Sequence, residues 1–436
     1  MQEKATLYVY AVYLLSLFAL LKSLKDIFFL TIKDVNPPLY YFLLHFWIKL
    51  FGDFEYVTRS LSLLLFLLLV LSSFFLIKHF LKDWKISLLG SLTILLNPFL
   101  IEYAFETRAY MFFTFLIITS VLFYLKKKYL LSSLIFALAL LTHNFAIFFL
   151  IAFFIFWFYE NRENLKKKIG NFFLTFILPI AVLFYWLSFL WNQWVKVTEG
   201  FWISPKTSSI FIDTFQAYFQ GFNDLPSSAS LYNLVIALVF LGLSYWVVKI
   251  FIKDDSHQDK EILFLVFLFS IPFLIVYLIS AFWTPIFHER FLMPILPFFI
   301  IFIIYSLFRL FNLKRSLSYL ILALGVAYLF FGVQSSEEIL RKTTKPTINY
   351  AVRQVLLIAE ENDVIVPESN LNFLETKYYA QRFRKKVPIY AYSPEEAKIP
   401  FYIGGVLFED KEIIKEYPKD KKVWVITPDG SYHLKD

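Results

Sequence analysis

Long apolar segments recur along this chain of 436 residues. Each is roughly 15 to 22 residues long, close to the length that a helix needs to cross a bilayer. Hydrophobic residues make up 59% of the sequence, far more than the core of a soluble protein can hold. We therefore predict an α-helical polytopic membrane protein with about ten to eleven transmembrane helices. The predicted spans are residues 5–22, 58–77, 86–105, 109–125, 129–142, 145–159, 170–191, 230–250, 262–283, 291–311 and 317–334.

The formal net charge of +8 comes from short basic clusters between the apolar segments. A nucleic-acid partner would instead favour one continuous basic surface. Cytoplasmic loops of membrane proteins are enriched in Lys and Arg, so these clusters report topology. The clusters that we place in the cytoplasm are Lys78/Lys82/Lys85, Lys126–Lys128, Lys166–Lys168, Lys249/Lys253 and Arg309/Lys314/Arg315.

Two of these clusters predict on which side of the membrane the other loops lie. If Lys126–Lys128 and Lys166–Lys168 are both cytoplasmic, an even number of crossings separates them, and residues 129–159 form a tight hairpin. Its polar break, Thr142-His143-Asn144, then lies near the outer face. The same parity places the other unusual polar residues outside, namely Asp34, Glu106, Arg108, residues 192–228, His288 to Arg290 and everything after residue 335.

Several site classes are excluded or disfavoured. The chain has no Cys, which removes disulfides, thiolate metal sites and Cys nucleophiles. No set of His and carboxylates has the spacing of a zinc site, and no GxxxxGK[ST] segment supports an ATP-driven pump. The two halves show no convincing repeat, which weakens a secondary-transporter architecture. We expect no cofactor and leave a divalent cation open.

The composition changes after residue 335, where charges of both signs mix with short apolar runs. Residues 363–367 and 422–426 are predicted as strands, and residues 347–361 carry apolar positions at helical spacing. We expect a small soluble α/β domain outside the membrane over residues 336–436, after a transmembrane domain of residues 1–335. Gly404-Gly405 is interpreted as a turn.

The segment Asp34-Val35-Asn36-Pro37-Pro38-Leu39-Tyr40-Tyr41 places an acid at the predicted outer surface. The paired prolines restrict the backbone, so we expect a rigid extended corner with Asp34 just before it. As a structural residue, Asp34 would cap a turn or the next helix. As a functional residue, it would be a general base toward an acceptor hydroxyl.

A second outer segment, Glu106-Thr107-Arg108-Ala109-Tyr110, has two interpretations. Arg108 could reach the lipid headgroups while Glu106 neutralises it. Alternatively, its planar guanidinium binds a phosphate or pyrophosphate in a bidentate manner, with Tyr110 flanking that headgroup.

The remaining candidates also have a structural and a functional interpretation. His143 either satisfies nearby carbonyls at its hairpin tip or belongs to a site. Arg290, in His288-Glu289-Arg290, is either an interfacial anchor or a second phosphate ligand. The aromatic-rich residues 192–228 fit an amphipathic segment in the interface better than a lid over a cleft.

These motifs together resemble the GT-C membrane glycosyltransferases, in the branch of the protein O-mannosyltransferases and of the aminoarabinose or galacturonic acid transferases that act on lipid A. Asp34 to Tyr41 is similar to the D-x-H-P-P-L-x-Y corner of that family, and Glu106 to Tyr110 to its E-x-R-x-Y segment. Thr142-His143-Asn144 and Arg290-Phe291, followed by Pro294 and Pro297, complete the resemblance over about residues 30–310.

The resemblance implies a sugar transferase in the inner or plasma membrane that uses a polyprenyl-phosphate donor on the outer side. The acceptor would be a lipid, a glycan or a protein. By this resemblance Asp34 contacts the acceptor or supports its base, Arg108 and Arg290 bind the donor phosphate, and the acceptor or supporting contacts come from Asn36, Tyr40, Glu106, Tyr110, His143 and His288.

The sequence departs from the family pattern at two places. The Asp-Glu pair that family members carry after the first span is absent at its usual distance, and Gln2-Glu3 is the nearest imitation. Either Glu3 supplies the catalytic acid and residues 5–22 lie on the membrane surface, or 5–22 is the first span and the pair is absent. Asn36 replaces the usual His and can form hydrogen bonds but not titrate. A transporter or flippase of lipid-linked saccharides, and a non-catalytic scaffold, remain as alternatives.

Overall fold

The computed structural model describes residues 23–199, 203, 209–221, 226–252, 257–313, 315–342, 348–381, 383, 386–394 and 407–435. The predicted span 5–22, Glu3 and Gly404-Gly405 lie outside these residues. The chain divides into two compact units. The first unit contains the described residues up to Leu61, Glu106–Arg108 and the residues from Lys342 onward. The second, helical unit contains Ser62–Phe105 and Ala109–Arg341. The predicted domain boundary at residue 335 stays a prediction.

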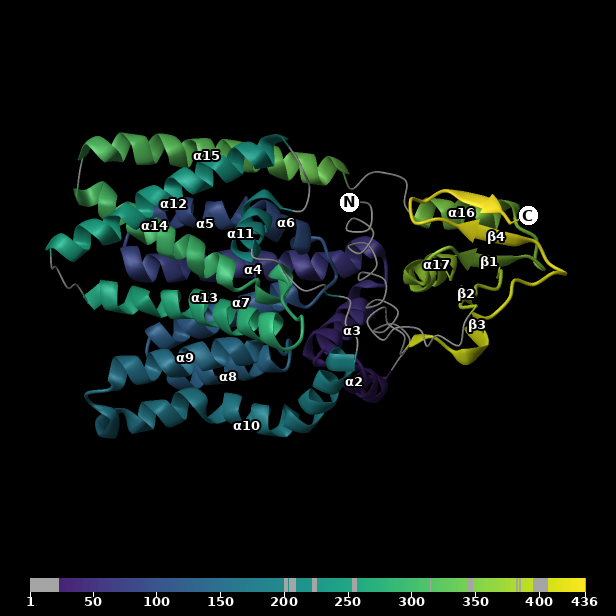
Figure 1. Ribbon diagram of the computed structural model, residues 1–436, viewed down its shortest axis with the longest axis horizontal. Helices are drawn as coiled ribbons and strands as arrows, with labels where there is room; N and C mark the ends of the chain where they lie inside the picture. Colours follow the sequence, from purple (N-terminus) through teal and green to yellow (C-terminus); the bar gives the residue numbers. More distant parts are fainter. Residues whose placement is uncertain are drawn as a thin grey trace. The chain divides into compact units, whose positions relative to one another are not determined.

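Each predicted span from residue 58 onward falls on helical structure, because long runs without charged residues leave the backbone to satisfy its own hydrogen bonds. Figure 1 shows the long helices of the helical unit running side by side. The helices from residue 55 to residue 342 are α4 (Glu55–Leu81), α5 (Trp84–Leu95), α6 (Pro98–Ala104), α7 (Tyr110–Leu125), α8 (Tyr129–Leu140), α9 (Ala146–Asn161), α10 (Leu165–Glu199), α11 (Ile210–Gln220), α12 (Pro226–Ile252), α13 (His257–Phe282), the 3-10 helix η1 (Glu289–Leu292), α14 (Ile295–Leu313) and α15 (Arg315–Lys342).

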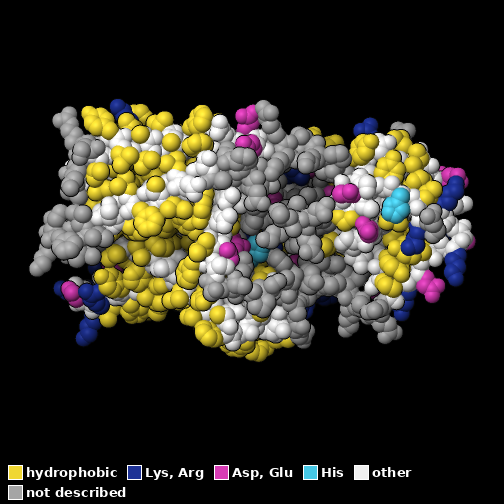
Figure 2. All heavy atoms as spheres, turned by 45° about the horizontal axis from the view of Figure 1, so that its top comes forward, with side chains coloured by type: hydrophobic (Ala, Val, Ile, Leu, Met, Phe, Trp, Pro, Cys, Tyr) yellow, Lys and Arg dark blue, Asp and Glu magenta, His cyan; other side chains and the backbone are white. Residues whose placement is uncertain are grey.

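Aromatic contacts dominate the interior of the helical unit. Helix α8 packs against α7 and α10, and α13 packs against α9 and α14. Phe156 of α9 stacks on Phe264 of α13 with ring centroids 4.3 Å apart. On the outside, α10 leaves Phe184 71% exposed, and Figure 2 shows hydrophobic side chains over the surface of the long helices. Such a surface suits contact with hydrocarbon rather than water.

The apolar helices differ in whether they are long enough to cross a bilayer. Among the described residues, five helices are long and apolar enough to cross a bilayer, or six if α5 and α6 form one bent span. Helices α7, α8 and α9 are apolar but have only 16, 12 and 16 residues. At about 1.5 Å per residue they are shorter than a hydrocarbon core of roughly 30 Å. The chain is an integral membrane protein, and the predicted ten to eleven spans stay a prediction.

The predicted continuous span 86–105 is wrong in one respect, because it is broken between α5 and α6. The two helices meet at an angle of 66°. Asn97 begins the second helix, its Oδ1 accepting the N–H of Leu100 at 3.0 Å, and Pro98 follows at the first helical position. Proline has no N–H to continue the preceding helix, and Asn provides a cap for a new one.

In the other unit, two short helices flank the acid-Pro-Pro segment. Ser23 caps α2 (Leu24–Lys33) through a capping box with Asp26. Helix α3 (Leu39–Phe51) starts directly after the buried Pro38. The expectation of an extended corner is therefore only partly met: Asp34 has extended backbone angles, but it begins a turn with Val35, Pro38 already has helical angles (φ −83°, ψ −15°), and Leu39 to Tyr41 are helical. Pro tolerates the start of a helix because the first N–H groups have no partner there.

The predicted strands and helix after residue 335 are confirmed. Strands β1 (Val364–Pro367) and β4 (Val423–Ile426) pair in parallel, and β5 (Tyr432–Leu434) pairs antiparallel with β4. Helix α16 (Ile348–Ile358) packs its apolar face on this sheet. The other elements are η2 (Asn370–Asn372), α17 (Phe373–Ala380), β2 (Ala391–Tyr392), η5 (Asp410–Glu412) and β3 (Ile413–Ile414), with β2 and β3 parallel.

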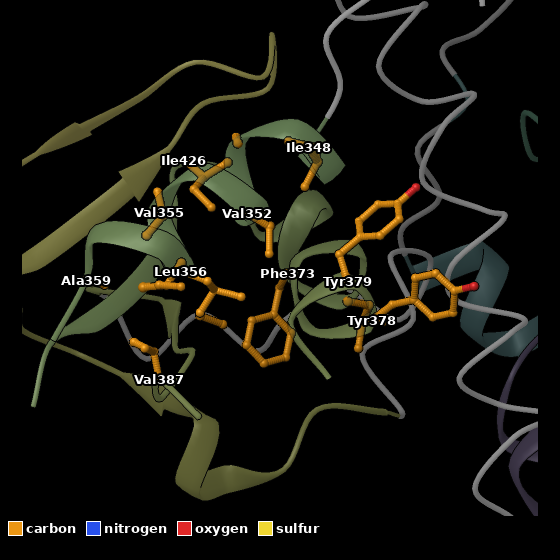
Figure 3. Packing of buried hydrophobic residues seen from close by; sticks show 14 residues of the cluster. Ile348, Val352, Val355, Leu356, Ala359, Phe373, Tyr378, Tyr379, Val387 and Ile426 are labelled. Atoms are coloured by element: carbon orange, nitrogen blue, oxygen red, sulfur yellow. The ribbon is translucent and has the colours of Figure 1, made fainter. Parts of the chain in front are cut away.

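One face of the sheet carries the larger core. Ile365 and Ile426 belong to the core in which α16 and α17 bury Val352, Val355 and Phe373. Figure 3 shows Ile426 facing the valines of α16. Successive side chains of a strand point to opposite faces of the sheet. The other face therefore carries Val364, Val366, Val423 and Val425, which are all buried. Both faces of the central strand pair are therefore apolar, which fits its parallel pairing.

Helix α17 also contacts the start of α4 within the same unit. Tyr378 donates its hydroxyl hydrogen to the backbone carbonyl of Asp53 at 2.6 Å. Tyr379 donates to Oε2 of Glu55 at 2.8 Å. These bonds join the C-terminal elements to the segment that follows α3.

Candidate functional site

An aromatic cluster forms around Phe291 at the η1 turn of the helical unit. The rings of Tyr110, His143 and His288 have centroids 6.2, 5.6 and 5.6 Å from that of Phe291. Tyr110 and His143 are themselves 5.7 Å apart. Three residues predicted from separate parts of the sequence are thus gathered on one phenylalanine.

Arg290 is the cation of this cluster. Its guanidinium carbon lies 5.9 Å from the ring centroid of Tyr110 and 5.4 Å from that of Phe291. The residue is only 5% exposed. A guanidinium held over aromatic faces keeps its charge and its planar set of donors, which suits an anion such as a phosphate.

His143 lies in the turn between α8 and α9, where the even number of crossings predicted a hairpin tip. Its ring stacks on Phe113 with centroids 4.9 Å apart and an interplanar angle of 17°. Nδ1 accepts the backbone N–H of Phe145 at 3.2 Å, so this nitrogen carries no proton. In the neutral ring the remaining hydrogen is on Nε2, which makes His143 a donor there.

Glu289 was missing from the predicted site and is buried beside it, at 4% exposure. Its Oε2 lies 3.2 Å from Nδ1 of His288, whereas the N–H of Arg290 lies 3.4 Å from the same nitrogen. Nδ1 of His288 cannot donate to Glu289 and accept from the Arg290 N–H at the same time. The contact with Glu289 is shorter and charge-assisted, which favours donation to Glu289. The sequence signal for Glu289 was its position between two predicted site residues, His288 and Arg290.

Asp34 ends α2 in the other unit. Its N–H donates to the carbonyl of Leu30 at 2.9 Å, and Asn36 Nδ2 donates to Asp34 Oδ2 at 3.3 Å. The N-cap position of helix α3 is Pro38, which makes no side-chain capping bond. Asn36 forms the hydrogen bond expected of its amide. Tyr40 is fully buried and packs edge-on against Tyr41 at 6.1 Å.

Glu106 and Arg108 belong to this same unit and pair with each other. Arg108 Nε lies 3.8 Å from Glu106 Oε2, and the N–H of Arg108 donates to the carbonyl of Glu106 at 2.8 Å. A separation of 3.8 Å is an ion pair that is too long for a hydrogen bond at Nε. Glu106 therefore forms an ion pair with Arg108, as predicted, but no hydrogen bond joins Nε to Oε2.

The predicted residues thus fall into two groups. Tyr110, His143, His288 and Arg290 form one cluster in the helical unit, whereas Asp34, Asn36, Tyr40, Glu106 and Arg108 belong to the other unit. Glu3 lies outside the described residues. In the part of the chain that the structure describes, no three His or carboxylate side chains are grouped as a metal site would require.

Tyr218 is a second residue that sequence reasoning did not assign to the site. It lies in the aromatic-rich segment 192–228. Its hydroxyl lies 3.1 Å from the carbonyl oxygen of Glu289, a contact across 71 positions that no local pattern indicates.

Comparisons of sequence identify no relative: no family model matches the chain, and no curated protein does. Comparison of structure does find similar folds. ArnT from Cupriavidus metallidurans, in the apo state, matches 90% of this chain and 82% of its own with a TM-score of 0.59 at 11% identity. The same protein bound to undecaprenyl phosphate matches 97% and 91% with a TM-score of 0.57, also at 11% identity.

A weaker match is the archaeal oligosaccharyltransferase AglB from Archaeoglobus fulgidus, which was determined with an inhibitory peptide and a dolichol-phosphate. It covers 88% of this chain and 60% of its own, with a TM-score of 0.46 and 11% identity. The likeness to ArnT extends over nearly the whole of both chains and is a likeness of fold. The predicted resemblance is thereby confirmed at that level: the chain has the GT-C fold of the membrane glycosyltransferases.

Proposed function

We propose that the chain transfers a sugar from a polyprenyl-phosphate carrier to an acceptor of the cell envelope, at the outer face of the cytoplasmic membrane. The observation that carries the proposal is the fold shared with ArnT over 97% of this chain, in a structure where ArnT holds undecaprenyl phosphate. The acceptor class, whether lipid, glycan or protein, stays open.

Arg290 is the proposed ligand of the donor phosphate. A phosphate next to a guanidinium forms short, charge-assisted hydrogen bonds, often two in parallel. The rings of Tyr110 and Phe291 limit the directions that the guanidinium can take. In this proposal His143 donates from Nε2 to the phosphate or to the sugar, and Glu289 holds His288 in one orientation.

Asp34 is the proposed contact to the acceptor hydroxyl, either as its base or as support for it. The side chain is half-buried at the end of α2, and its Oδ2 already accepts the amide of Asn36. The Asp34 backbone is held by its N–H bond to Leu30, and a carboxylate that also accepts a side-chain hydrogen bond is oriented before the acceptor arrives. Arg108 is proposed as a second phosphate ligand, with Glu106 as its partner.

Binding of undecaprenyl phosphate tests the donor site directly. The purified protein in nanodiscs is titrated with this lipid, and the bound fraction is measured by native mass spectrometry. Arg290→Ala is expected to weaken binding at least tenfold, since a hydrogen bond to a charged group contributes about 1.5–3 kcal/mol.

The matched control is Arg309→Ala. Arg309 also lies over a tyrosine ring, 5.9 Å from the centroid of Tyr245, but it belongs to a predicted cytoplasmic cluster. This variant is expected to bind the lipid as the wild type does. Equal binding by wild type, Arg290→Ala and Arg309→Ala would refute the proposed donor site.

A further inference from the structure

Helix α11 buries one face inside the helical unit, and the buried Tyr218 lies in its last turn. Tyr218 is 5% exposed, and its ring packs edge-on against Phe99 of α6 with centroids 5.0 Å apart. Phe211, on the same helix, is 58% exposed. The interior side of α11 thus points the Tyr218 hydroxyl toward η1, which packs against this helix.

The hydroxyl of Tyr218 meets two backbone carbonyls of the η1 turn. It lies 3.1 Å from the carbonyl oxygen of Glu289 and 3.2 Å from that of Leu292. A hydroxyl has one hydrogen, so the two carbonyls share one donor. These carbonyls are one residue before and two residues after Arg290. The turn is a 3-10 helix of four residues, whose own hydrogen bonds have poorer geometry than those of an α-helix.

The backbone of Tyr218 is held by Asn97, the residue at the break between α5 and α6. The Nδ2 of Asn97 donates to the carbonyl oxygen of Tyr218 at 2.9 Å, while its Oδ1 caps α6. Asn97 has no exposed surface. Three residues after Tyr218, Gly221 ends α11 at φ +72°, and a Cβ there would lie 3.2 Å from a carboxylate oxygen of Glu102. Tyr218 is therefore held both at its backbone carbonyl and at its hydroxyl.

We infer that Tyr218 is a positioning residue: its hydroxyl holds the η1 turn so that the Arg290 guanidinium stays over Tyr110 and Phe291 in the orientation that a donor phosphate requires. The inference rests on the proposed function, because it assigns Arg290 to that phosphate. A bidentate contact depends on the direction of the guanidinium plane as well as on its charge. Release of the turn would reduce phosphate affinity while the charge of Arg290 is retained.

The test is Tyr218→Phe, which removes one oxygen atom and keeps the ring against Phe99. Binding in nanodiscs is measured for undecaprenyl phosphate and for undecaprenol, which has the same chain and no phosphate. We expect the variant to bind the phosphate five- to twentyfold more weakly and the alcohol unchanged. Tyr124→Phe is the matched control, because it removes a buried hydroxyl that donates to Glu160 at 2.8 Å, away from η1.

Each result decides the inference. Loss of phosphate affinity alone, in Tyr218→Phe but not in Tyr124→Phe, supports it. If Tyr218→Phe keeps full phosphate affinity while Arg290→Ala loses it, the donor site stands and the inference is overturned. If Tyr218→Phe weakens both lipids, or if Tyr124→Phe matches it, the hydroxyl serves the fold and not the arginine. If Arg290→Ala binds like the wild type, the proposed donor site itself fails.

Discussion

Glu375 of α17 is buried without a full counter-charge, and its titration is predicted to control how firmly that helix is held. The residue is 1% exposed. Burial raises the pKa of its carboxyl to about 8, and the nearby Glu55 adds to this, while Asn372 and Arg59 oppose it. All of these groups belong to one compact unit. At neutral pH, Glu375 is therefore mostly protonated.

The sign and size of the effect follow from linkage. The folded state retains a proton that the unfolded state releases near pH 4.5, so the stabilisation is full below that pH and is lost as the pH rises through about 8. One proton corresponds to a slope of about 1.4 kcal/mol per pH unit. Between pH 6 and 8 the predicted loss is about 2 kcal/mol, which corresponds to a factor of about thirty in the opening equilibrium.

Hydrogen exchange of peptides covering α17 measures this loss locally. Wild type is compared with Glu375→Gln at pH 6, 7 and 8, because the ratio of the two protection factors at one pH cancels the intrinsic exchange rate. That ratio is expected to fall about thirtyfold from pH 6 to 8, since the amide cannot ionise.

The control is Glu412→Gln in η5, which removes the 2.5 Å partner of Lys377 on α17 and leaves Glu375 intact. It is expected to lower protection of α17 while retaining the pH slope of the wild type. A ratio of wild type to Glu375→Gln that does not change between pH 6 and 8 would refute the reasoning, because Glu375 would then not titrate in that range.

Three further predictions concern single contacts. Tyr379→Phe removes the bond to Glu55 and should lower the local stability of α17 by about 1–2 kcal/mol, measured by the same exchange experiment. Asn97→Ala removes both the cap of α6 and the bond to α11, so the midpoint of thermal unfolding should fall by several degrees, as a loss of about 2 kcal/mol implies; an unchanged midpoint would contradict the role of the helix break. Arg108→Ala should weaken binding of undecaprenyl phosphate, whereas Arg162→Ala, at an exposed arginine over Tyr159, should not; equal affinities in the two variants would remove Arg108 from the donor site.

Much of the helical architecture could be predicted because a span is a local property of sequence. Apolar runs gave the positions of α7, α8 and α9 to within a few residues, and charge parity gave the turn at His143. Short runs of β-branched and aromatic residues likewise identified the strands at residues 363–367 and 422–426.

The misses share a different physical origin. The break at Asn97 lies within a run of apolar residues, where one cap and one proline outweigh the hydrophobic pattern. Helix α3 follows a Pro-Pro pair that reads as a corner, although proline also suits the first turn of a helix. The contact of Tyr218 with η1 depends on tertiary packing, which a single sequence does not reveal.

The measurement that tests the central claim most directly is mass spectrometry of envelope lipids and glycoconjugates. The strains are a deletion of this gene and the same deletion complemented with wild type, Asp34→Asn, Arg290→Ala or Arg309→Ala. The account predicts that one sugar increment on one acceptor disappears on deletion and returns with wild type and Arg309→Ala, but not with Asp34→Asn or Arg290→Ala. An unchanged glycoconjugate profile on deletion, or full restoration by Arg290→Ala, would contradict it.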